Sequence, residues 1–152
     1  MKKILGSVII PVLCSLMVGC ASTGTDGKTS GTVNVKEVAA RTFGGANFKI
    51  HEVSYSSGIA SAVMGSTSEE FALLREITPA QSAQVNLVLW GRSSALSAGV
   101  ITRCFQHYVP LSVRNGNLSK LRLLYIGKAE DAQNIKPLVE ASGATFLFHA
   151  AP

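Results

Sequence analysis

The chain has 152 residues, 47% hydrophobic and 15% charged, which allows one packed domain with a short tail and excludes two full domains. Removing Lys2 and Lys3 from the 14 basic residues leaves 12 against 9 acidic ones, a net charge of +3 instead of +5. So weak a charge, with 7% aromatic residues and no run of Lys or Arg, argues against nucleic acid as a partner.

The first 21 residues have the pattern of an exported chain. A basic start is followed by the apolar residues 4–18, which have the length of a signal-peptide hydrophobic region and are too few for an ordinary membrane-spanning helix. The region ends in Leu16-Met17-Val18-Gly19-Cys20-Ala21, which resembles the lipobox of bacterial lipoproteins, with Met17 where leucine is usual. The resemblance implies cleavage before Cys20, lipidation of that cysteine and anchoring to a membrane by its acyl chains. A plain secretory leader is the alternative.

The residues after Cys20 bear on destination and reach. Ala21-Ser22 lacks the aspartate that usually retains lipoproteins in the inner membrane, so the resemblance implies the outer membrane with the domain facing the periplasm. Surface exposure and inner-membrane retention stay open. Residues 21–33 are small, polar and rich in Gly, Ser and Thr, so we expect a flexible linker that reaches about 20 Å. The expected organisation is a signal peptide over 1–19, the lipidated cysteine and linker over 20–33, and one domain over 34–152.

In the first part of the domain, hydrophobic spacing predicts a helix over 35–43, capped by Asn34 and ended by Gly44 and Gly45. A strand follows over 48–55, and then a Gly/Ser/Ala-rich loop over 56–66. The residues Thr67-Ser68-Glu69-Glu70 have the pattern of a capping box, which predicts a helix running to Ile77, where Thr78-Pro79 ends it and can open one more turn.

The second part of the domain alternates strands and helices. The expected elements are a strand over 85–90, a helix over 95–108, a short edge strand over 109–113, a turn at 115–117, a strand over 121–126, a helix over 129–142 in which Pro137 produces a bend or a fresh start, and a strand over 144–149. Residues 87–92 and 123–128 share one order: apolar strand, glycine, cation, helix. Two such units predict an α/β fold, a small single domain with a partly parallel sheet flanked by helices.

Three cysteines are present. Cys14 leaves with the leader and Cys20 takes the lipid, so Cys104 remains without an intramolecular disulfide partner. Cys104 lies on the apolar stripe of the helix expected over 95–108, which predicts a buried and inert side chain. An intermolecular disulfide, or a nucleophile assisted by His107, is the alternative.

No pattern typical of catalysis or metal binding emerges. His51, His107 and His149 lack ligand spacing, so no metal or cofactor is expected. Five carboxylates are expected to be solvated or to be stabilised by helix dipoles: Glu69, Glu70, Glu76, Glu130 and Asp131. Residues 91–95 lack the closing glycine of a serine-nucleophile motif. The domain is therefore expected not to be an enzyme and to have no catalytic residue.

The strand-to-helix turns are the best candidate for a ligand or partner site. In a parallel sheet they lie at one edge, where helix N-termini and cations favour an anionic group. The candidate residues are Gly91, Arg92, Ser93, Ser94, Gly127 and Lys128. If the two strands are neighbours, the turns should open on one cleft; the alternative is tight turns with solvated cations.

These observations favour a membrane-anchored lipoprotein that is a non-enzymatic accessory component of a cell-envelope complex, such as a secretion, pilus, conjugation or outer-membrane assembly machine. Its expected partners are the membrane, through the lipid anchor, and an envelope protein. A small-ligand or anion-binding lipoprotein and a thiol-dependent enzyme at Cys104 are the alternatives. The identity of the partner and the oligomeric state stay open.

Overall fold

The computed structural model describes residues 33–54, 69–113 and 117–151, which belong to one compact unit, Gly31–Pro152. The predicted signal peptide, Cys20, nearly all of the linker, the loop at 56–66, Thr67 and most of the turn at 115–117 lie outside the described residues. Four described strands form one sheet in sequence order: β1 (Lys49–Val53), β2 (Val85–Gly91), β3 (Leu121–Gly127) and β4 (Thr145–Ala150). All three pairings are parallel, so the α/β class is confirmed and the described sheet is parallel throughout.

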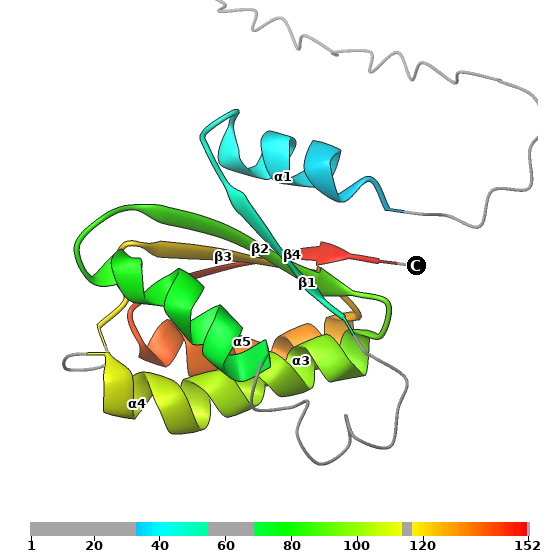
Figure 1. The fold of residues 1–152 in the computed structure, drawn as a ribbon. Helices are drawn as coiled ribbons and strands as arrows, with labels where there is room; N and C mark the ends of the chain where they lie inside the picture. The colour runs from blue at the N-terminus through cyan, green and yellow to red at the C-terminus, as the bar shows by residue number, and fades with distance from the viewer. Residues whose placement is uncertain (1–32, 55–68, 114–116, 152) are drawn as a thin grey trace, which may run out of the picture. The chain divides into compact units, whose positions relative to one another are not determined.

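One face of the sheet is covered by the helices that connect the strands (Figure 1). These are the helix at residues 69–77 with the 3-10 turn η1 (Thr78–Gln81), then α3 (Ser94–Arg103), η2 (Cys104–Tyr108) and α4 (Val109–Ser112), and finally α5 (Ala129–Ala141). Strands that follow one another in sequence order, joined by crossovers of one hand, place every connection on the same face. The buried residues there include Leu73, Ile77, Ile101, Ile135, Val139, Leu87, Leu89 and Leu123.

The opposite face is covered by α1 (Val35–Phe43), which lies across the sheet from the other helices (Figure 1). Its buried residues Val35, Ala39 and Phe43 pack on the sheet residues Val88, Leu124 and Ile126. As expected, Asn34 caps the helix by accepting from the Glu37 amide, and Gly44 ends it with a φ of 64°. β2 and β3 therefore contact apolar residues on both faces, which explains their nearly continuous apolar sequences.

The expected edge strand over 109–113 is wrong, because the chain stays helical from α3 through the π-helix η2 into α4. Pro110 lies in the first turn of α4, directly after the π-helix η2. Val109 and Val113 are both buried. Residues four apart lie on the same face of a helix and also on the same face of a strand, so their spacing is compatible with either. Pro137 lies inside α5 without interrupting it.

Candidate functional site

The two candidate turns lie at the same edge of the sheet, because β2 and β3 are parallel neighbours and each is followed by its turn. Both glycines are required by close packing. A Cβ on Gly91 would lie 3.0 Å from the Val53 carbonyl oxygen, and one on Gly127 would lie 2.5 Å from the Tyr125 hydroxyl oxygen. The expected parallel direction is thus confirmed, the two strands are direct neighbours, which the sequence had left open, and the glycines have a structural role there.

The space between the two turns is filled by a hydrogen-bond network centred on Ser94. The Ser94 hydroxyl donates to the Asp131 carboxylate and accepts from the Lys128 amide at 2.8 Å. The Tyr125 hydroxyl donates to the Ser94 carbonyl at 3.0 Å and lies 2.8 Å from its Oγ. Burial raises the pKa of Tyr125, which keeps the hydroxyl protonated as a donor. Ser94 and the Lys128 amide therefore hold the two turns together and are not open to a ligand.

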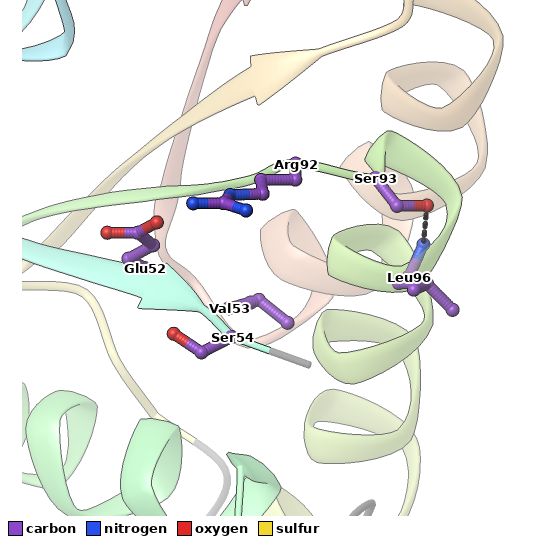
Figure 2. Close-up of a pocket in the computed structure, with 6 residues that line it drawn as sticks. All are labelled: Glu52, Val53, Ser54, Arg92, Ser93 and Leu96. Atoms are coloured by element: carbon purple, nitrogen blue, oxygen red, sulfur yellow. Dashed lines mark hydrogen bonds between the residues drawn. The ribbon is translucent and has the colours of Figure 1, made fainter. Parts of the chain in front are cut away.

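A pocket of about 280 Å³ lies at the carboxyl ends of β1 and β2 instead (Figure 2). It is lined by Glu52, Val53, Ser54, Arg92, Ser93 and Leu96. Of the candidate residues, Arg92 and Ser93 line this pocket, whereas Lys128 does not. The Lys128 side chain is 67% exposed, with its Nζ 3.9 Å from the Glu130 carboxylate. The two cations share an edge but not one cleft.

The side chains of the pocket come from three short segments. Ser93 caps α3, its Oγ accepting from the Leu96 amide at 3.4 Å, while the exposed Arg92 guanidinium extends toward the Glu52 carboxylate (Figure 2). Neither charged group forms an ion pair with a described residue. The sequence did not identify Glu52, Val53, Ser54 and Leu96 as lining residues of this pocket. A parallel pairing of β1 with β2 would have placed the end of β1 beside the turn that carries Arg92.

A second polar cluster joins the helix at residues 69–77 to its neighbours. His51, 7% exposed on β1, has its Nδ1 3.1 Å from the Glu76 carboxylate and its Nε2 3.3 Å from that of Glu69. Glu70 is 1% exposed and contacts the Arg103 guanidinium of α3. Glu70 is therefore not solvated, although its place in the first turn of this helix fits the other expectation, a charge favoured by the helix dipole. In the parts of the chain that the structure describes, no group of three or more His, Cys, Asp or Glu can hold a metal ion.

The remaining carboxylates also have specific partners or positions. Asp131 lies in the first turn of α5, as the helix-dipole expectation has it, and also accepts from Ser94. Glu69 and Glu76 both contact His51, whereas Glu130 is 76% exposed as expected. These contacts join segments far apart in the chain, which helical spacing within one element does not reveal.

Cys104 is buried, as predicted. Burial, and to a smaller degree the nearby Glu70 carboxylate, raises the pKa of its thiol to about 12. The Sγ lies 3.7 Å from the Glu70 carbonyl oxygen, to which the thiol donates. A thiol in this setting stays protonated near neutral pH and is a poor nucleophile.

Comparison with family models, with curated proteins and with solved structures finds no match for this chain. None of the helices that the structure describes is long and apolar enough to cross a membrane.

Proposed function

We propose that the protein is a lipid-anchored, non-enzymatic accessory component of a cell-envelope complex, whose α/β domain binds an anionic group of its partner at the carboxyl edge of the sheet. The observation that carries the binding half is the Arg92 guanidinium, exposed in a pocket and without an ion-pair partner among the described residues. A guanidinium presents a planar fork of donors that matches a carboxylate or phosphate. Lys128, on the same edge, adds positive charge that favours an acidic partner surface.

The anchoring half rests on the sequence. The lipobox pattern that ends at Cys20 implies a lipidated N-terminus, and more than one acyl chain is needed for stable attachment. The Gly/Ser/Thr-rich residues 21–33 separate that cysteine from α1, so the domain can reorient above the membrane to meet a partner. The residues after Cys20 favour the outer membrane, with the domain in the periplasm.

The buried setting of Cys104 favours binding over catalysis, because a raised thiol pKa opposes the thiol-dependent enzyme alternative. The pocket itself favours the second candidate function, a lipoprotein that binds a small ligand through an anionic group of that ligand. The two candidates share Arg92 as the contact with the anion. They differ in whether Lys128, outside the pocket, contributes to binding.

Fractionation of cells tests the anchor. Cys20→Ala should release the protein from membranes and abolish incorporation of a palmitate analogue, because the acyl acceptor is removed. Cys14→Ala, a matched change within the leader, should leave both unchanged. A Cys20→Ala protein that still sediments with membranes would contradict the proposal.

Cross-linking in cells tests the contact surface. The double variant Arg92→Ala, Lys128→Ala should lose its cross-linked envelope partner, and the wild-type complex should weaken as salt is raised. The matched variant Lys36→Ala, Lys136→Ala removes two cations from α1 and α5 and should retain the partner. Unchanged cross-linking in the first variant would reduce Arg92 and Lys128 to solubilising charges.

A further inference from the structure

Two opposite charges, those of Glu52 and Arg92, line the pocket without pairing. Figure 2 shows the Glu52 carboxylate near the end of β1 and the Arg92 guanidinium beyond β2, which extends toward it. No ion pair joins them. A purely anionic ligand would be attracted by Arg92 and repelled by Glu52. A ligand that carries both charges would satisfy both groups.

The sheet register places the two residues close together in the fold. Glu52 is the parallel partner of Trp90, and Arg92 follows Trp90 by two residues, just after β2 ends at Gly91. Gly91 cannot be replaced without a shift, since its Cβ would meet Ser97 and the Val53 backbone, so the turn that positions Arg92 keeps a close approach to β1. The backbones that carry the two charges are therefore fixed relative to one another.

The remaining lining combines two hydroxyl groups, Ser54 and Ser93, with two apolar side chains, Val53 and Leu96. Leu96 is 37% exposed on the first turn of α3, so its surface is open to contact. The volume of about 280 Å³ is at the low end of the roughly 300–1,000 Å³ of most ligand pockets, so the pocket suits a small molecule.

We propose that this pocket binds a free α-amino acid with an apolar side chain. Its carboxylate contacts Arg92, its ammonium group contacts Glu52, and its side chain packs on Leu96. The assignment rests on the proposed function, because Arg92 is the anion contact in both. Beyond the proposed function, it assigns Glu52 as the contact for an ammonium group and names amino acids as the class of ligand.

Trp90 supplies a direct readout, because it is the chain's one tryptophan, is partly exposed and lies two residues before Arg92. The mature full chain, in detergent, is titrated with leucine, with N-acetylleucine, which keeps only the negative charge, and with leucinamide, which keeps only the positive charge. Tryptophan fluorescence follows binding, and calorimetry provides an independent measure.

We expect leucine to bind, and each single-charge analogue to bind about tenfold more weakly, since each loses one charge-assisted contact. Glu52→Gln should bring leucine and N-acetylleucine to similar affinity, and Arg92→Gln should weaken both by about tenfold or more. Glu130→Gln and Lys136→Gln, which change exposed charges of α5 outside the pocket, should bind as the wild type does.

Two results would overturn the assignment of an amino acid. N-acetylleucine binding as tightly as leucine would identify a simple anion site, which leaves the proposed function in place. Absence of leucine binding in a chain that still cross-links to its partner through Arg92 would show that the pocket serves the partner alone. If the Arg92→Ala, Lys128→Ala variant still cross-links to the partner while the wild type binds leucine, the result would instead count against the proposed partner surface.

Discussion

The guanidinium of Arg103 on α3 contacts the carboxylate of Glu70, a side chain that is 1% exposed on the helix at residues 69–77. This pair joins two segments more than 30 residues apart through the Glu70 Oε1, and the Glu70 Oε2 has no hydrogen-bond partner among the described residues. Removing the cation would leave a buried carboxylate without its counter-charge, which is costlier than losing the pair as a whole.

Arg103→Ala should therefore lower the free energy of unfolding by about 2 kcal/mol, less than for a fully buried pair because Arg103 is 43% exposed. Urea unfolding measures the change. The double variant Arg103→Ala, Glu70→Gln should recover part of the loss, since the buried charge is then absent. If the double variant is destabilised by the sum of the single changes, the two side chains are not coupled.

The thiol of Cys104 should resist labelling by a thiol reagent at neutral pH until the domain unfolds. It is buried, and its pKa of about 12 leaves almost no thiolate at pH 7. Labelling rates measured across a urea transition should follow the unfolded fraction. Rapid labelling of the native chain would contradict the burial and revive the thiol-dependent enzyme.

Stability should also fall at alkaline pH. The pKa of the Cys104 thiol is raised from 9.0 to about 12, so the folded chain holds this proton more tightly than the unfolded chain does. The contribution is complete below pH 9 and is lost as the pH rises toward 12. Cys104→Ala should give a shallower decline in unfolding free energy above pH 9 than the wild type. Tyr125, whose pKa is also raised, adds a loss of the same sign in both proteins.

Ser94→Ala should destabilise the domain by about 1–3 kcal/mol, because it leaves the Lys128 amide and the Asp131 carboxylate without their shared partner. Thermal unfolding and amide exchange at Lys128 report the loss. Ser112→Ala, at an exposed serine of α4, is the matched control and should be nearly neutral. Fast exchange at Lys128 in the wild type would argue against the network.

Residues 34–152, expressed alone, should form a soluble domain that unfolds cooperatively. Both buried clusters, one on each face of the sheet, lie within this range apart from the partly buried Val33. A thermal melt without a transition, or amide exchange without protected strands, would show that this prediction is wrong.

The local features of the fold could be read from the sequence. Hydrophobic spacing located α1 and α5, the Asn34 cap marked a helix start, and the apolar runs of β2 and β3 indicated strands covered on both faces. The segment over 109–113 was misjudged because Val109 and Val113 fit both periods. The choice between helix and strand is decided by the helical chain that continues from α3 through η2 into α4.

By itself, the sequence determined the α/β class, the two strand–glycine–cation–helix units and the burial of Cys104, because each depends on spacing within one element. Tertiary structure alone decided that Arg92 lines a pocket with Glu52 rather than with Lys128, that Ser94 bonds to Asp131, and that Glu70 is buried in contact with Arg103 of α3. Those contacts join residues from different elements. Their distances depend on strand order and helix packing, which no local pattern of residues specifies.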